Sequence, residues 1–313
     1  METRHIPVLA EEVLEALEVQ PGGRYCDGTV GGAGHALQIL ERSAPTGQLL
    51  CLDRDPQAIQ RARQRLAPFG QRITLCHRNF AELVDLLTEL GMAPLDGLLL
   101  DLGVSSFQLD EPERGFAFSS NGPLDMRMDP TTGRTAAELI ASLSEAELSQ
   151  VIHRYGEEPS STRIARAIKR ASRDGDLSGT ADLARVVSSA LDRRGPRRGS
   201  TIHPATRTFM ALRMAVNDEI GSLRRFLDTF TEALRPRGRV AVISFHSLED
   251  RAVKQTLSRL ANPCVCPPSL PVCACDRKPS VALLTRKPIR PGEAERERNP
   301  RSRSARLRVA ELI

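Results

Sequence analysis

The fold of this chain is decided by the stretch Arg24-Tyr-Cys-Asp-Gly-Thr-Val-Gly-Gly-Ala-Gly-His35 and by the apolar segment Ala36-Leu-Gln-Ile-Leu40 that follows it. This pattern predicts a short strand that ends at Asp27, a glycine-rich turn, and the first turns of a helix. Glycines in such a turn let the backbone bend sharply, and they let a ligand approach the main chain without meeting a Cβ atom. The N–H groups at the start of the helix then face that ligand. We therefore expect the turn to hold a nucleoside-containing cofactor.

The segments beyond this turn alternate between apolar runs and helical periods. After an entry segment and helix within residues 5–17, strands are expected at residues 48–53, 72–77, 95–101 and 239–245, and helices at residues 56–66, 81–90 and 248–260. This alternation is typical of βαβ units around a parallel sheet that is buried on both faces. Two later apolar segments, residues 281–284 and 305–310, are expected to close the sheet as a hairpin.

The alternation stops from about residue 107 to about residue 208, where no convincing strand is predicted. Helices are expected there at residues 136–143, 145–154, 162–171 and 181–191, the second of them behind a Ser144…Glu147 capping box. A long helical stretch, residues 204–234, then leads back to the sheet. We therefore expect a doubly wound α/β domain formed by residues 1–110 and 209–313, interrupted by an all-helical insertion at residues 111–208.

The composition argues against secreted disulfide scaffolds and membrane proteins. The chain carries seven cysteines, an odd number for a disulfide framework in 313 residues. No apolar stretch approaches the length needed to cross a bilayer, and no apolar run follows positive charge at the start of the sequence. We therefore expect a cytoplasmic protein without a membrane partner. Aromatic residues make up only 4% of the chain, which disfavours a broad platform for base stacking.

The acidic residues at the ends of the predicted strands narrow the choice of cofactor. The turn lacks the dinucleotide spacing G-x-G-x-x-G, because the third position after Gly34 is Leu37. Each of three predicted strands ends in an acid, namely Asp27, Asp53 and Asp101. Asp53, at the end of the second strand, fits the acid that binds a ribose on a doubly wound sheet. Acids rather than Lys or Arg around the turn disfavour a phosphate-rich ligand and suit a ligand that is cationic and has no phosphate. S-adenosylmethionine has both properties. The alternative is that these aspartates only cap helices.

Several blocks of sequence, in order along nearly the whole chain, resemble the RsmH (MraW) methyltransferase family. They are Asp27-Gly-Thr-Val-Gly-Gly-Ala-Gly-His35, Leu52-Asp-Arg-Asp-Pro56, Asp101-Leu-Gly-Val-Ser-Ser106, Gln108-Leu-Asp110, Glu113-Arg-Gly-Phe-Ala-Phe118, Gly122-Pro-Leu-Asp-Met-Arg-Met-Asp129, His203-Pro-Ala-Thr-Arg-Thr-Phe209 and Ser244-Phe-His-Ser-Leu-Glu-Asp-Arg251. The resemblance implies a class I, Rossmann-like methyltransferase sheet with an inserted helical domain. It also implies S-adenosylmethionine-dependent methylation of the N4 amino group of a cytidine in the decoding region of 16S rRNA, in the small ribosomal subunit.

The same resemblance implies which residues contact the cofactor. The matching positions are Ala33, Gly34, His35, Asp53, Phe80, Asp101 and Gln108. The backbone of residues 33–35 would face the methionine portion of the cofactor, and Asp53 would hold the ribose. Phe80 either packs on the adenine or is a core residue at the end of a strand. The sequence leaves open whether the chain forms a homodimer.

Methylation of an exocyclic amine needs an acceptor for its N–H bonds, because the N4 lone pair of cytosine is delocalised into the ring. Many amino-methyltransferases carry an Asn/Asp-Pro-Pro-aromatic motif after the fourth strand, whereas this chain has Asp101-Leu-Gly-Val. Asp101 is our first candidate for the catalytic acceptor and His246 the second. The alternative for His246 is a structural role that orders the loop at residues 244–250.

Candidate substrate contacts lie outside the sheet. Asp125, Arg127 and Asp129 either shape the cytidine pocket, as the family suggests, or only form ion pairs with each other and their neighbours. Phe107, Phe116 and Phe118 either stack on a flipped-out base or belong to a core. Basic clusters at helical spacing are usually solvated helix faces, whereas the Gly/Pro-interrupted segment at residues 193–198 is a better candidate for phosphate contacts. We therefore expect RNA binding by Arg193, Arg194, Arg197 and Arg198.

Four cysteines flank a proline-rich turn in two C-x-C pairs. The pairs are Cys264 with Cys266 and Cys273 with Cys275. Zinc sites usually have C-x-x-C spacing, and C-x-C is a weaker match, so we assign no metal and leave zinc binding open. A second reading of the whole chain is a non-catalytic ribosome-assembly or RNA-binding factor on a methyltransferase-like fold. A nicotinamide oxidoreductase is disfavoured by the glycine spacing.

Overall fold

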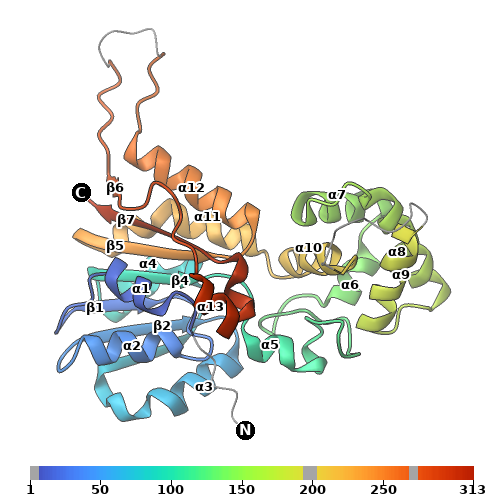
Figure 1. Cartoon of the computed structure of the whole chain (residues 1–313), viewed down its shortest axis with the longest axis horizontal. Helices are drawn as coiled ribbons and strands as arrows, with labels where there is room; N and C mark the ends of the chain where they lie inside the picture. The colour runs from blue at the N-terminus through green and yellow to red at the C-terminus, as the bar shows by residue number, and fades with distance from the viewer. Residues whose placement is uncertain (1–6, 193–202, 268–273) are drawn as a thin grey trace. The chain divides into compact units, whose positions relative to one another are not determined.

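The computed structural model in Figure 1 describes residues 7–192, 203–267 and 274–313. They form two compact units, one from the residues up to Gly103 together with Ile220–Ile313 and one from Val104–Glu219. The helical unit therefore begins at residue 104, seven residues before the expected start at residue 111, and ends at residue 219, eleven residues after the expected end at residue 208. No helix among the described residues is long and apolar enough to cross a membrane.

The first unit contains a seven-stranded mixed sheet in the order β3-β2-β1-β4-β5-β7-β6. Its strands are β1 (Arg24–Asp27), β2 (Gln48–Asp53), β3 (Ile73–His77), β4 (Leu95–Asp101), β5 (Leu234–Ser244), β6 (Val281–Leu283) and β7 (Arg306–Leu312). The first five are parallel, whereas β7 runs antiparallel to both β5 and β6. The expected doubly wound α/β sheet and its closing hairpin are confirmed.

Helices cover both faces of this sheet. They are α1 (Ala10–Ala16), α2 (Gly34–Arg42), α3 (Pro56–Leu66), α4 (Leu83–Leu90), α11 (Glu219–Thr229), α12 (Ser247–Ala261) and α13 (Glu293–Arg298). Figure 1 shows α2 and α3 on one side of the sheet and α11 and α12 on the other. The alternation of side chains along β4 explains the two cores, because Leu99 faces the first while Leu98 and Leu100 face the second.

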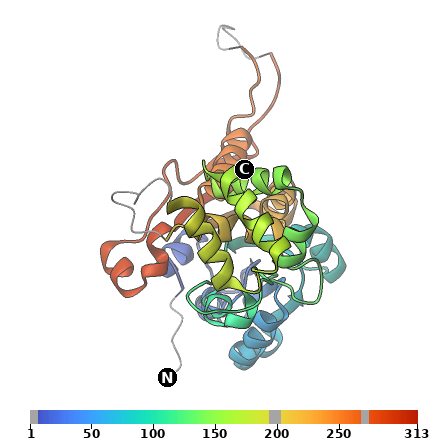
Figure 2. The same ribbon diagram turned by 90° about the vertical axis from the view of Figure 1, so that its right-hand side faces the viewer.

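The described residues of the second unit contain helices and no strand (Figure 2, green and yellow). They are α5 (Ser106–Asp110), α6 (Ala136–Ser142), α7 (Glu145–Gly156), α8 (Ser161–Asp174), α9 (Thr180–Asp192) and α10 (Thr206–Val216). Ser144 and Glu147 form the expected capping box at the start of α7. Buried Ile152, Ile164 and Phe209 join α7, α8 and α10 in a core that is separate from those of the sheet.

The helical stretch expected at residues 204–234 is interrupted. It divides into α10, α11 and a short 3-10 turn, Phe230–Ala233, because Asp218 has φ of 46° and cannot continue a helix. Asn217 ends α10, and its backbone N–H still donates to the Arg213 carbonyl oxygen at 3.1 Å. Propensity alone did not reveal this break, because neither Gly nor Pro marks it.

Candidate active site

The glycine-rich turn after β1 is held in place by the strands on either side of it. The Gly28 N–H donates to the Leu99 carbonyl oxygen of β4 at 2.9 Å, and the Val30 N–H donates to the Leu52 carbonyl oxygen of β2 at 2.8 Å. The backbone of the turn is therefore fixed at the carboxyl edge of the parallel strands, where ligands of doubly wound sheets bind.

Gly28 has no room for a side chain, and Ala33 has a strained backbone. A Cβ atom at Gly28 would overlap the buried Leu100 side chain and would lie 3.2 Å from the Cβ atom of Phe80. Ala33 is the N-cap of α2 and has φ of 59°, a left-handed conformation that costs free energy in residues other than glycine. Its side chain is fully buried. Strain of this kind is concentrated at ligand sites, which agrees with the predicted role of residues 33–35.

Asp27 and Asp53 brace the turn through backbone N–H groups. Asp27 Oδ1 accepts a hydrogen bond from the Thr29 N–H at 3.1 Å, and Asp53 Oδ2 accepts one from the Gly31 N–H at 2.9 Å. Asp53 Oδ1 accepts a further bond from the Asp55 N–H at 2.8 Å. A carboxylate has about four lone-pair positions, so Asp53 retains acceptor capacity for the hydroxyl groups of a ribose.

Asp101 ends β4 beside His35, which lies in the first turn of α2. The His35 Nε2 and Asp101 Oδ2 atoms are 3.7 Å apart. Asp101 Oδ1 is buried and has no hydrogen-bond partner in the described structure. The backbone N–H of Asp101 donates to Thr29 Oγ1 at 2.7 Å, which ties the end of β4 to the glycine-rich turn. The site therefore presents a fixed carboxyl oxygen that can accept a hydrogen bond from a ligand.

Burial, with added repulsion from neighbouring acids, raises the pKa values of these three acids. Burial raises the pKa of Asp27 to about 7 and that of Asp53 to about 6, against the opposing effect of the N–H bonds that each accepts. Burial, with added repulsion from Asp27 and Glu249, raises the pKa of Asp101 to about 8. A cation placed among these carboxyl groups would favour their ionised forms. The electrostatics therefore fit a positively charged ligand and oppose a phosphate.

Phe80 lies directly after β3 at the edge of one core. Its ring packs edge-on against Phe226 of α11, with the ring centroids 5.9 Å apart, and the residue remains partly exposed. Packing in the core and contact with an adenine are therefore compatible, because the T-shaped contact with Phe226 leaves part of the ring available.

His246 follows β5 and caps α12. Its Nδ1 atom accepts a hydrogen bond from the Leu248 N–H at 3.3 Å, and Glu249 Oε2 accepts bonds from the N–H groups of Phe245 and His246, both at 3.0 Å. These contacts order the loop after β5, which is the structural role considered for His246. In the neutral ring this arrangement puts the proton on Nε2, so His246 can donate from that atom.

The other predicted contacts lie in the helical unit. Gln108 is buried in α5 and forms a capping box with Ser105. Asp125 and Arg127 pair with each other through two hydrogen bonds of 2.8 Å, and Asp129 Oδ1 accepts a bond from the Thr131 hydroxyl at 2.6 Å. Arg193, Arg194, Arg197 and Arg198 lie outside the described residues.

The phenylalanines of this unit favour packing over base stacking. Phe116 is buried in the helical core, and the Arg114 guanidinium lies 5.8 Å from the centre of its ring. Phe118 packs against His203 and Phe209, with ring centroids 4.5 Å and 4.9 Å away.

Comparison with known proteins identifies the family. A model of the MraW methylase family matches residues 2–313. The chain belongs to the MraW methylase family. Two relatives named Ribosomal RNA small subunit methyltransferase H, from Symbiobacterium thermophilum and Syntrophotalea carbinolica, are 52% and 53% identical to it, and the alignments cover 99% and 98% of this chain and 96% and 97% of theirs. A solved structure of a SAM-dependent O-methyltransferase from Thermotoga maritima aligns with 12% identity and a TM-score of 0.43. The alignment covers 100% of this chain and 68% of that protein's chain.

As a member of the MraW methylase family, the chain is a methyltransferase whose cofactor is S-adenosylmethionine. The site described above fits this cofactor, because a positively charged sulfonium group suits the three acids and Asp101 Oδ1 has no hydrogen-bond partner among the described residues. Sequence reasoning missed Thr29, whose hydroxyl oxygen joins the turn to Asp101. The sequence signal for this link was a threonine in the glycine-rich turn, and threonine is too common in turns to be singled out.

Proposed function

We propose that this chain transfers the methyl group of S-adenosylmethionine to the N4 amino group of a cytidine in the decoding region of 16S rRNA. The cofactor supplies an electrophilic methyl group on a positively charged sulfur atom. The name shared by relatives about 50% identical supports a small-subunit rRNA substrate. The observation that carries the choice of an amine is Asp101 Oδ1, a buried acceptor at the carboxyl edge of the sheet to which no group in the described part of the chain donates. A ribosomal substrate is found in the cytoplasm.

In this proposal the residues of the first unit divide the work. Asp53 accepts hydrogen bonds from the ribose, the backbone of residues 33–35 holds the methionine portion, and Phe80 packs on the adenine. Asp101 accepts a hydrogen bond from an N–H group of the cytidine amine. This bond holds the nitrogen in line with the methyl carbon. Fixing this amine is the main contribution, because an amine conjugated to the ring is a weak nucleophile.

Asp101 is a better acceptor than His246. The Nδ1 lone pair of His246 is already used by the Leu248 N–H, and the Nε2 atom of the neutral ring is a donor. His246 therefore fits the structural role, in which it orders the loop after β5 and the start of α12.

The helical unit supplies substrate contacts in this proposal. The bidentate pair of Asp125 and Arg127 fixes the backbone of its loop, because Asp125 Oδ1 also accepts from the Arg127 N–H at 3.0 Å. Asp129 completes the proposed substrate contacts of this loop, whereas Gln108 remains a proposed contact of the cofactor. The target cytidine must be unpaired or flipped out of its helix to reach the methyl group.

The proposal is tested by single-turnover methyl transfer with the Asp101→Asn variant. Asn keeps the shape of Asp101 but cannot carry a negative charge, so we expect methyl transfer to slow by about 100-fold or more. Asp85→Asn changes an exposed acid on α4 and should transfer at the wild-type rate. Full turnover by Asp101→Asn would contradict the assignment of the acceptor.

The alternative of a non-catalytic assembly factor has a distinct outcome in the same experiment. A wild-type chain that binds S-adenosylmethionine and small subunits, yet methylates neither free nor assembled 16S rRNA, would support it and overturn the proposed function.

A further inference from the structure

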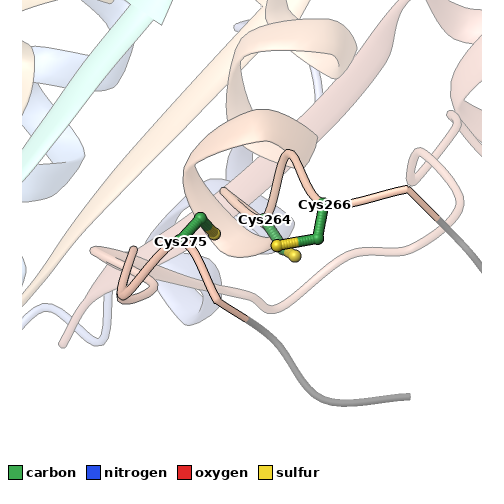
Figure 3. Close-up of side chains that lie close together, drawn as sticks. All are labelled: Cys264, Cys266 and Cys275. Atoms are coloured by element: carbon green, nitrogen blue, oxygen red, sulfur yellow. The ribbon is translucent and has the colours of Figure 1, made fainter. Parts of the chain in front are cut away.

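Three cysteine side chains converge far from the glycine-rich turn, on the segment that links α12 to β6. Cys264 and Cys266 follow the end of α12, and Cys275 precedes β6. Their sulfur atoms all lie within 4.8 Å of one another, and Figure 3 shows the side chains directed toward each other. The fourth cysteine of this sequence pattern, Cys273, lies outside the described residues.

The backbone around these sulfur atoms suits thiolates. The Ala274 N–H donates to Cys266 Sγ at 3.3 Å, the kind of bond that supports a metal-bound sulfur. The Ser280 N–H donates to the Leu260 carbonyl oxygen at 3.0 Å, so the segments that leave α12 and enter β6 lie side by side. Asp276, Arg277 and Lys278 follow Cys275 in the sequence, and their net positive charge would partly offset the negative charge of a thiolate site.

We propose that Cys264, Cys266 and Cys275 bind a zinc ion as thiolates. Zinc–sulfur bonds of about 2.3 Å in a tetrahedral site place the sulfur atoms about 3.8 Å apart, so small side-chain rotations suffice here. Thiolates select soft ions such as zinc and disfavour magnesium and calcium. Each thiol loses its proton on binding, and water or a further donor completes the fourth position.

The position of this site argues for a structural role. His246 begins α12 at the carboxyl edge of the sheet, and a 15-residue helix is about 22 Å long. The three cysteines therefore lie beyond the opposite edge of the parallel strands, away from Asp101. A zinc ion there would tie the end of α12 to the approach to β6 and would take no part in methyl transfer.

The proposal is tested by measuring the metal content of the full-length chain, purified under reducing conditions from zinc-supplemented cells. We expect about one zinc ion per chain. The variants Cys264→Ser, Cys266→Ser and Cys275→Ser should each lose most of the metal while they keep methyl transfer. Cys76→Ser changes a half-buried cysteine of β3 outside the cluster and should retain the metal.

A second measurement covers loss of the ion during purification. Cobalt(II) added to reduced, metal-free chain should produce the intense near-ultraviolet absorption of cobalt–thiolate bonds, and zinc should abolish that absorption. Two results would overturn the proposal: no zinc and no cobalt–thiolate band in the wild-type chain, or undiminished zinc in the Cys264→Ser variant. A cluster joined by disulfide bonds in freshly purified chain, detected by mass spectrometry after alkylation without reduction, would also overturn it.

Discussion

Asp101 is the residue whose ionisation bears most directly on cofactor binding. Its pKa of about 8, and that of about 7 for Asp27, mean that both carboxyl groups are largely protonated at pH 6. A cationic ligand favours the ionised forms, so its binding releases protons and weakens as the pH falls below these pKa values. Affinity for S-adenosylmethionine should therefore rise between pH 6 and pH 8, by up to about tenfold per pH unit for each proton released.

S-adenosylhomocysteine is the matched control for this prediction, because it lacks the methyl group and the positive charge on sulfur. Calorimetric titrations at pH 6, 7 and 8 should give a clearly flatter pH dependence for it than for S-adenosylmethionine. Parallel profiles for the two ligands would contradict the electrostatic role given to the three acids.

Asn217 is a residue whose effect extends through the helical unit. Its Oδ1 atom accepts a hydrogen bond from the Met128 N–H at 2.7 Å, and its Nδ2 atom donates to the Met126 carbonyl oxygen at 2.7 Å. Asn217 is 2% exposed, so water cannot replace these bonds easily. Asn217→Ala should therefore destabilise the loop that carries Arg127 by about 2 kcal/mol.

Hydrogen exchange measures this prediction directly. Amide groups of residues 124–129 should exchange about 30-fold faster in Asn217→Ala, since 2 kcal/mol corresponds to that factor at 25 °C. Asn262→Ala changes an exposed residue after α12 and should leave exchange in this loop unchanged. Equal exchange in Asn217→Ala and wild type would show that the loop is held by other contacts.

At the scale of elements, α12 is attached to β7 by a charged cluster. Asp250 Oδ1 accepts a hydrogen bond from Arg308 at 2.6 Å, and Oδ2 accepts one from Arg306 at 2.9 Å. Burial alone would raise the pKa of Asp250, but the bonds and charges of these two arginines outweigh it and lower the pKa below its usual value. Arg308 is only 6% exposed, so it depends on this partner.

Asp250→Asn should lower the free energy of unfolding by about 3 kcal/mol, because it leaves the buried Arg308 without its counter-charge. The exposed pair of Asp228 and Arg259, 3.7 Å apart, is the control, and Asp228→Asn should cost less than about 1 kcal/mol. Urea denaturation of both variants compares the two costs.

The pH dependence of the Asp250 effect has a defined sign. The stability gained from an acid with a lowered pKa is present above the pKa of the unfolded chain, about 3.9, and is lost as the pH falls through the folded value. The difference between wild type and Asp250→Asn should therefore be constant near neutral pH and shrink below about pH 4. A difference that grew on acidification would contradict this account of the cluster.

Most elements could be predicted from the sequence because their patterns are local. Pro56 starts α3 and the apolar run of β4 ends at Asp101, as expected. The break at Asp218 could not be predicted, because neither Gly nor Pro marks the position of its left-handed backbone. The boundaries of the helical unit differ from expectation because α5 and α10 belong to it by packing rather than by local pattern.

For the whole molecule, strand order explains how much of the site could be predicted. Parallel strands end at one edge, so the sequence could place Asp27, Asp53 and Asp101 together there. It could not reveal the 3.7 Å approach of His35 to Asp101, or the link through Thr29, because these join segments far apart in the chain. The predicted roles of these residues, and those of Gln108, Asp125 and Asp129, await the variants described above.

The central claim is most directly tested by the identity of the methylated nucleoside. Small subunits from a strain that lacks this activity would be incubated with the chain and radiolabelled S-adenosylmethionine, and the 16S rRNA digested to nucleosides. We predict that the label is found in N4-methylcytidine, from a single position in the decoding region. Label in any other nucleoside, or in none while the cofactor binds, would contradict the account.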